Sequence, residues 1–209
     1  MEKGLLITLE GGEGCGKSTQ AVNIKNWLMS HGYPVLFAIE PGETAIGEVI
    51  RELVLSKKNT EMDIVSEVFL YMAARAQLTK EMIQPALAKG EAVLLDRHID
   101  SSMAYQGYAR GLGFELVNQL NQIATRGRKP DITFYFDLDP IIGLKRKNLA
   151  SKGNMDRLES ESLIFHQKVR EGYLKLAEME KDRIKIIDAS QNPAQVWNQI
   201  ELILKQSLS

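Results

Sequence analysis

The sequence has few of the residues that mark several classes of protein. Its 209 residues include one cysteine, Cys15, which excludes an intrachain disulfide and favours a reducing compartment. The formal net charge is −1, so the chain carries no general attraction for a nucleic-acid polymer. No apolar run approaches the length of a membrane span, and the first one, at 5–9, leaves no room for a signal peptide. We therefore expect a cytoplasmic protein that binds neither a nucleic-acid polymer nor a membrane.

Short apolar segments alternate with longer helix-compatible segments along the chain. No repeat or low-complexity linker divides the sequence, so we expect one domain over residues 1–209. The strand-like segments are Leu5–Leu9, Val35–Ile39, Ala92–Leu95, Ile132–Leu138 and Ile184–Ile187. The helical segments include Lys17–Ser30, Val65–Lys89 and Leu163–Glu180. This alternation predicts an α/β fold, with a five-stranded parallel sheet flanked by helices on both faces.

The segment that follows the first strand has the spacing of a phosphate-binding loop. It reads Gly11-Gly12-Glu13-Gly14-Cys15-Gly16-Lys17-Ser18-Thr19 and leads directly into a helix. Glycines let successive backbone N–H groups and the positive helix end face one anion. We expect the whole segment to bind ATP, with Lys17 on the β- and γ-phosphates and the Ser18 hydroxyl on Mg²⁺. A glycine-rich turn without a ligand is the alternative, but the flanking strand and helix favour a P-loop NTPase fold.

The residues after the other strands are candidates for a second site, because ligands of parallel sheets bind beyond the carboxyl ends of the strands. Asp96 and Arg97 follow the third strand. A carboxylate there is placed to organise the water ligands of Mg²⁺, and the adjacent guanidinium suits a second phosphate. The polar residues at 137–140 and 188–191 are equally well explained as ordinary strand ends.

Several ordered motifs beyond the loop resemble those of bacterial thymidylate kinases. They are Glu40-Pro41-Gly42, Tyr71-x-Ala73-Ala74-Arg75, Asp96-Arg97-His98-x-x-Ser101-Ser102-x-Ala104-Tyr105-Gln106-Gly107 and Asp156-Arg157-Leu158-Glu159. The resemblance extends over essentially the whole chain. It implies an ATP-dependent kinase that converts dTMP to dTDP, uses Mg²⁺ and forms a homodimer.

The resemblance also implies where thymidine would bind. Tyr71 would stack on the thymine, and Arg75, one helical turn later, would bind the base edge. Ser102 and Gln106 match positions near the base. Tyr105 matches the ring beneath the deoxyribose, where it leaves little space for a 2′-hydroxyl. Without the resemblance, Tyr71 would be interpreted as an ordinary core aromatic.

A further set of residues would hold the phosphates by the same resemblance. Arg51 and Arg97 match side chains that bind the monophosphate, although a lone Arg51 in a helix would otherwise be a solvated charge. Glu13 and Glu40 match carboxylates at the junction of the two phosphates. The expected metal site comprises Ser18, Asp96 and Glu13, and the expected catalytic cations include Lys17 and Arg97.

Residues 143–158 have the composition of a small basic lid. In some family members an arginine of the phosphate loop neutralises the transferred group, and Gly14 occupies that position here. We therefore expect the lid to supply the charge, through Arg146 and Arg157. Lys152 is a weaker candidate, because an ammonium group lacks the bidentate fork of a guanidinium. A solvated charge run on a loop is the alternative.

Two residues depart from the family pattern Arg-Glu-Pro-Gly-Gly-Thr after the second strand. Ile39 replaces the arginine and removes a cation near the acceptor phosphate. Glu43 replaces a glycine, which adds an anion and makes a positive φ less favourable. We expect these changes to affect acceptor affinity more than the type of reaction.

Other functions compete with this interpretation. The nearest is a kinase for another nucleoside monophosphate or for a deoxynucleoside, whose hydroxyl would need a carboxylate base such as Glu40. A regulatory nucleotide switch would lack the acceptor arginines and the basic lid. A nucleic-acid-binding protein would spread basic residues over one long face, which this sequence does not do.

Overall fold

Five parallel strands form the central sheet of the structure, a computed structural model that describes residues 4–208. The strands are β1 (Leu5–Gly11), β2 (Val35–Ile39), β3 (Ala92–Asp96), β4 (Ile132–Asp137) and β5 (Ile184–Asp188). Their order is β2-β3-β1-β4-β5, so β1 is central and pairs with β3 and β4. The predicted α/β fold with a five-stranded parallel sheet is confirmed, and each predicted strand agrees with the observed one to within two residues.

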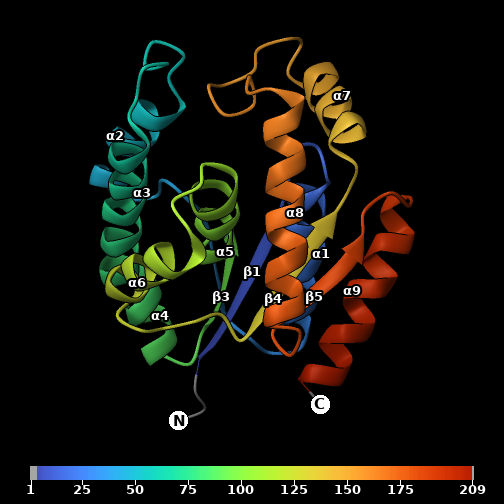
Figure 1. The fold of residues 1–209 in the computed structure, drawn as a ribbon. Helices are drawn as coiled ribbons and strands as arrows, with labels where there is room; N and C mark the ends of the chain where they lie inside the picture. Colours follow the sequence, from blue (N-terminus) through green and yellow to red (C-terminus); the bar gives the residue numbers. More distant parts are fainter. Residues whose placement is uncertain (1–3, 209) are drawn as a thin grey trace.

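Helices cover both faces of the sheet (Figure 1). One face carries α1 (Lys17–Ser30) and α9 (Pro193–Ser207), which pack on the residues of β1, β3 and β4 that point to that side. The other face carries α3 (Ile64–Leu78), the π-helix η1 (Thr79–Ile83), α4 (Gln84–Ala88), α5 (Ile99–Ser102), the π-helix η2 (Met103–Ala109) and α8 (Leu163–Met179). Two outer helices, α2 (Ala45–Leu55) and α6 (Phe114–Thr125), pack against α3. Across residues 4–208, no helix combines the length and hydropathy needed to cross a membrane.

The helical segment predicted over 65–89 consists of three elements rather than one. A π-helical turn at Thr79–Ile83 separates α3 from α4, and Pro85 lies in the first turn of α4. Proline has no N–H to donate to the preceding turn, and its ring clashes with the carbonyl four residues earlier. The wider π turn before it accommodates this interruption without ending the helical path.

The phosphate loop and the helix α7 (Pro140–Ala150) are in backbone contact at two glycines. Gly14 has a φ of +63°, and a Cβ on it would collide with the carbonyl of Gly143. A Cβ on Gly143 would in turn collide with the carbonyl of Glu13. Figure 1 shows α7 and the chain that follows it over the same end of the molecule as the carboxyl edge of the sheet. The contact therefore sets the basic residues of α7 directly beside the phosphate loop.

Replacement of Gly143 by alanine tests this contact. Helix propensity alone would make Gly143→Ala more stable by about 1 kcal/mol. Because the new methyl group has no room against the loop, we expect instead a loss of about 1–3 kcal/mol in the free energy of unfolding. Urea denaturation of the two proteins measures the difference, and a variant as stable as the parent would contradict the contact.

Candidate active site

A cavity of about 470 Å³ lies at the carboxyl edge of the sheet, between the phosphate loop, the ends of β2 and β3, and α7. Sequence-predicted residues make up much of its lining. They are Glu13, Gly14, Cys15, Gly16, Lys17, Ser18, Thr19, Glu40, Arg51, Tyr71, Arg75, Asp96, Arg97, Ser102, Tyr105, Gln106 and Arg146. Gly11, Gly12 and Arg157 are the predicted site residues that do not line it. The candidate donor and acceptor residues therefore share one cavity.

Lys17 lies against its own loop in the structure. Its Nζ donates to the carbonyls of Gly11 and Gly12 at 3.3 and 3.1 Å, and it contacts Cys15 Sγ at 3.6 Å. The thiol of Cys15 donates to Gly12 O at 3.0 Å and is buried, so it packs inside the loop as a small side chain. Ser18, at the start of α1, is exposed and lines the cavity.

Arg97 joins the phosphate loop to the acceptor side of the cavity. It follows β3 directly and has a φ of +70°, which turns its side chain back over the loop. Nη1 donates to Gly11 O at 2.9 Å, and Nη2 pairs with Glu13 Oε1 at 2.5 Å. The guanidinium also lies 5.3 Å from the centroid of the Tyr105 ring. Although burial disfavours its charged form, the positive charges of Arg97 and Lys17 lower the pKa of the Glu13 carboxyl.

Arg75 is fixed by hydrogen bonds to four oxygen atoms. Nε pairs with Glu40 Oε2 at 2.8 Å, and Nη1 donates to Ser102 Oγ at 2.9 Å and Asn121 Oδ1 at 2.6 Å. Nη2 donates to the carbonyl of His98 at 2.9 Å. The side chain is 2% exposed yet borders the cavity, so all three guanidinium nitrogens are held by the protein at the cavity wall.

Glu40 is held from a second side by His98. The ring Nδ1 lies 2.8 Å from Glu40 Oε1. Burial opposes ionisation, but the neighbouring Arg75 and His98 outweigh it and lower the pKa of the Glu40 carboxyl. Beside this pair, Arg51 Nη1 donates to the carbonyl of Pro41 at 2.6 Å.

The lid residues differ in where they lie. Arg146 lines the cavity, and its Nη1 donates to the carbonyl of Ala189 at 3.3 Å. Lys147 also lines the cavity and pairs with Glu159 at 2.8 Å, a position that sequence reasoning missed within the charge run. Arg157, which the sequence suggested as a cation for the phosphates, is instead buried against Glu67 at 2.6 Å. Lys152 is not part of the cavity lining.

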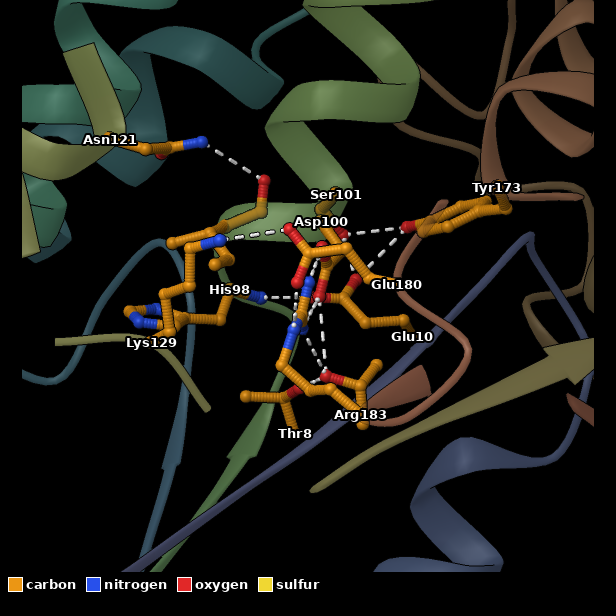
Figure 2. Close-up of polar contacts among 12 residues, drawn as sticks. Thr8, Glu10, His98, Asp100, Ser101, Asn121, Lys129, Tyr173, Glu180 and Arg183 are labelled. Atoms are coloured by element: carbon orange, nitrogen blue, oxygen red, sulfur yellow. Dashed lines mark hydrogen bonds and ion pairs between the residues drawn. The ribbon is translucent and has the colours of Figure 1, made fainter. Parts of the chain in front are cut away.

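A buried polar network around Glu10 joins the end of β1 to the turn after β3 (Figure 2). Glu10 accepts hydrogen bonds from Ser101 Oγ at 2.6 Å, Tyr173 Oη at 3.0 Å and the His98 N–H at 2.8 Å. Ser101 Oγ in turn lies 3.3 Å from Arg97 Nη1. Burial and the nearby charge of Asp100 raise the pKa of Glu10 to about 7.

Comparison with known proteins adds the deciding observation. Residues 9–200 match the family model described as thymidylate kinase. The thymidylate kinase of Geobacillus sp. (strain WCH70) is 48% identical over 93% of both chains. That of Thermoanaerobacter sp. (strain X514) is 46% identical over 99% of this chain and 100% of its own. A solved structure of thymidylate kinase from Ehrlichia chaffeensis superposes with a TM-score of 0.77 and 29% identity, and covers 97% of this chain and 99% of that one.

The chain belongs to the thymidylate kinase family.

Two residues differ from the family pattern, Ile39 at the end of β2 and Glu43 in the segment that follows it. Glu43 adopts a φ of +67°, so the glutamate stands in a left-handed conformation that glycine would adopt more easily. Hydrogen bonds hold it there, because its N–H donates to Glu48 Oε1 at 2.6 Å and its own Oε1 accepts from the Ile39 N–H at 3.2 Å. Ile39 lines the cavity with an apolar side chain.

Several residues that shape this cavity carry no signal in the sequence. Asn121 on α6 accepts a hydrogen bond from Arg75, and Glu67 on α3 accepts one from Gln106, but neither residue belongs to a motif recognised in the sequence. Which polar side chains of α3 and α6 are buried depends on how the helices pack, and the local sequence does not determine this. His98 belongs to the motif that begins at Asp96, and its hydrogen bond to Glu40 gives that position a physical role.

The raised pKa of Glu10 predicts a specific pH dependence of stability. The pKa of Glu10 in the folded protein, about 7, lies above its reference value of 4.5. The stabilising contribution of the protonated carboxyl to the free energy of unfolding is therefore fully present below pH 4.5 and is lost as pH rises through 7. Glu10→Gln removes this titration. The free energy of unfolding is measured in urea at pH 5 and at pH 8. Between these pH values the stability of the variant relative to the parent should rise by up to about 3 kcal/mol, at about 1.4 kcal/mol per pKa unit.

The exposed Glu178→Gln on α8 is the control, and its difference from the parent should be the same at both pH values. If Glu10→Gln behaves like the control, Glu10 does not titrate in this range in the folded protein.

Proposed function

We propose that this chain transfers the γ-phosphoryl group of ATP to dTMP and releases dTDP and ADP. The observation that carries the proposal is the single cavity in which a phosphate loop faces a set of acceptor side chains, with the Arg97–Glu13 pair between them. In a chain of this family, that geometry supports an ATP site and a dTMP site whose phosphates meet near Arg97.

Catalysis would consist of positioning and charge stabilisation. An oxygen of the dTMP phosphate forms a bond to the γ-phosphorus as the bond to the ADP oxygen breaks, and no covalent intermediate with the protein is needed. Lys17 would leave the carbonyls of Gly11 and Gly12 for the ATP phosphates. Arg97, already oriented by Gly11 and Glu13, would hold the acceptor phosphate in line with the transferred group.

The residues present fit Mg²⁺ bound largely through the nucleotide. Within the described residues, His, Cys, Asp and Glu side chains form no group of three that could hold a metal. Mg²⁺ usually keeps several waters and takes one or two protein oxygens together with substrate phosphates. The Ser18 hydroxyl, the Asp96 carboxyl and, through water, the Glu13 carboxyl would serve as these oxygens on the cavity wall. Bound there with ATP, the ion would neutralise phosphate charge.

The acceptor side suits a pyrimidine deoxynucleotide. Tyr71, Ser102 and Gln106 line the part of the cavity next to Arg75, and they offer a ring and hydrogen-bonding groups to a base. Tyr105 is buried, and its hydroxyl lies 3.3 Å from Glu13 Oε1, so its ring would be held firmly under the sugar. These positions support dTMP as the acceptor.

A deoxynucleoside kinase is the second candidate, and Glu40 is the observation that weighs against it. Such an enzyme needs a carboxylate base for a hydroxyl. Here both oxygens of Glu40 are bound, one to Arg75 and one to His98, and its lowered pKa makes it a weaker base. A phosphate acceptor is already ionised and needs no such base.

A coupled assay of ADP release with ATP and a panel of acceptors tests the proposal. We expect dTMP to give the highest kcat/KM, with thymidine inactive and ribothymidine monophosphate poor. Lys17→Ala should lower turnover at least about 10²-fold, as expected for removal of one preorganised charge-stabilising group. Turnover of thymidine in preference to dTMP would instead establish the deoxynucleoside kinase.

We further propose that Arg146 and Lys147 supply the lid charge. Both line the cavity on the helix that packs against Gly14, so neither needs a large movement to approach the phosphates. The phosphate loop has no space for an arginine at position 14, because the Gly143 carbonyl occupies it. We therefore assign to the neighbouring helix the positive charge that position 14 cannot supply, in addition to that of Lys17 and Arg97.

Single-turnover rates of alanine variants test the lid. Arg146→Ala or Lys147→Ala should lower kcat and kcat/KM together by about 10–10²-fold, the signature of a contact made in the transition state. Lys152→Ala is the matched control, since it removes a lid cation outside the cavity lining and should stay near the parent rate. Equal losses in all three variants would point to general electrostatics of the lid instead.

We propose that the chain acts as a homodimer in the cytoplasm. Exposed apolar residues gather on three helices that pack side by side at one flank of the molecule, α2, α3 and α6 (Figure 1). They are Ile46, Val49, Leu53, Val65, Phe69, Leu116 and Ile123. An apolar surface of this kind on a globular chain is typical of a subunit interface, and a twofold axis would place it against its own copy.

Sedimentation velocity tests the dimer. The parent protein should sediment as a dimer, and Phe69→Asp should shift it to monomer by placing a charge in the interface. Leu202→Asp on α9 is the control, because Leu202 is 57% exposed and Phe69 55%, yet Leu202 lies outside the three helices. A monomeric parent, or a Phe69→Asp protein that stays dimeric, contradicts this interface.

A further inference from the structure

The carboxylate of Glu67 is held between the lid and the acceptor side of the cavity. The side chain is 1% exposed, and Arg110 donates to both of its oxygens, from Nε to Oε1 at 3.4 Å and from Nη2 to Oε2 at 3.3 Å. Each oxygen also has a closer partner of its own. Oε1 accepts a hydrogen bond from Gln106 Nε2 at 2.8 Å, and Oε2 accepts one from Arg157 Nη2 at 2.6 Å. Burial disfavours the charged form, but the hydrogen bond from Gln106 and the charges of Arg110 and Arg157 outweigh it and lower the pKa of Glu67.

Arg157 attaches the end of the lid to the acceptor-side helices. Its backbone N–H donates to Leu55 O at 3.0 Å, and its Nε donates to Val54 O at 2.7 Å. Both carbonyls belong to the last turn of α2, where they have no partner within the helix and favour a cation. Three donors of one residue therefore fix the lid to α2 and α3.

The remainder of the lid is continuous with this attachment. Asp156 and Glu159 exchange hydrogen bonds, from Asp156 N to Glu159 Oε2 at 2.9 Å and from Glu159 N to Asp156 Oδ1 at 2.8 Å. Glu159 also pairs with Lys147 of α7 at 2.8 Å. A series of direct contacts thus runs from α7, beside the phosphate loop, through Arg157 to Glu67.

On α3, Glu67 lies one helical turn before Tyr71 and two turns before Arg75. Residues spaced by four share one face of a helix, and Tyr71 and Arg75 both line the cavity. Gln106, the other partner of Glu67, lines it as well. The carboxylate therefore lies directly behind the part of the cavity proposed for the base.

From these contacts we infer that Glu67 is a positioning residue that couples the placement of the lid to occupancy of the acceptor base site. The inference rests on the proposed dTMP site. A base that fixes the Gln106 amide also fixes the orientation of the Glu67 carboxylate. Because Arg157 donates to the same carboxylate, the base then also fixes the position of Arg157 and of the lid. Nucleotide bound under the lid acts in the reverse direction, because coupling between two ligands is reciprocal. Arg157 is then the anchor of the lid, and Arg146 and Lys147 are its cations for the phosphates.

Calorimetric titration of dTMP, with and without a non-hydrolysable ATP analogue and Mg²⁺, measures this coupling. In the parent protein the analogue should lower the Kd for dTMP. In Glu67→Gln the ratio of the two Kd values should fall to about 1, since an amide cannot pair with Arg157 and accept from Gln106 as the carboxylate does. Glu161→Gln is the control, because Glu161 also pairs with Arg110, at 2.6 Å against 3.3 Å for Glu67, and this substitution should leave the ratio unchanged.

Arg157→Gln tests the same link from the lid and leaves the buried Glu67–Gln106 hydrogen bond in place. In this variant the ratio of the two Kd values should fall to about 1, while the single-turnover rate at saturating substrates changes by less than about threefold. A rate loss of about hundredfold with the ratio intact would place Arg157 on the transferred phosphoryl group and overturn the inference. A parent ratio of 1, or a parent-like ratio in both variants, would overturn it too. Absence of dTMP binding to the parent protein would instead contradict the proposed function.

Discussion

The ion pair between Arg97 and Glu13 connects the two halves of the site. Arg97 stands at the end of β3 with a φ of +70°, a conformation that costs energy for a residue with a side chain. Its guanidinium is held by Gly11 and Glu13 of the phosphate loop and lies over the Tyr105 ring of the acceptor side. Below it, Ser101 and the Glu10 network support the same turn. Because these contacts converge on one side chain, Arg97 fixes the phosphate loop relative to the turn after β3.

The backbone contact between Gly14 and Gly143 has a chemical consequence. A side chain cannot be accommodated at position 14, so the phosphate loop itself cannot carry a cation to the transferred group there. The same contact places α7 against the loop, and Arg146 and Lys147 line the cavity from that helix. Close packing and the place of these two basic side chains on the cavity wall are therefore two results of one glycine pair in this thymidylate kinase family member.

The sequence predicts most of the parts whose signals are local. The spacing from Gly11 to Thr19, the apolar runs of the five strands and the polar ends of β1 to β3 each follow from residues within one element and its turn. The π-helical turn before Pro85 was missed because helical periodicity continues across it. Arg157 was predicted to face the phosphates because it belongs to a basic segment, but its partner Glu67 is 90 residues away in the chain. Asn121 and Tyr173 are likewise defined by packing between distant elements, which no local pattern records.

The proposed site holds both nucleotides in one cavity, with their phosphates meeting at Arg97. The decisive experiment is a titration with adenosine and thymidine joined through a chain of five phosphates. If both nucleotides share the cavity, one molecule of this compound should bind per chain, much more tightly than either ATP or dTMP alone, and each nucleotide should displace it separately. Competition with only one of the two nucleotides, or affinity no greater than that of ATP, would contradict a shared cavity.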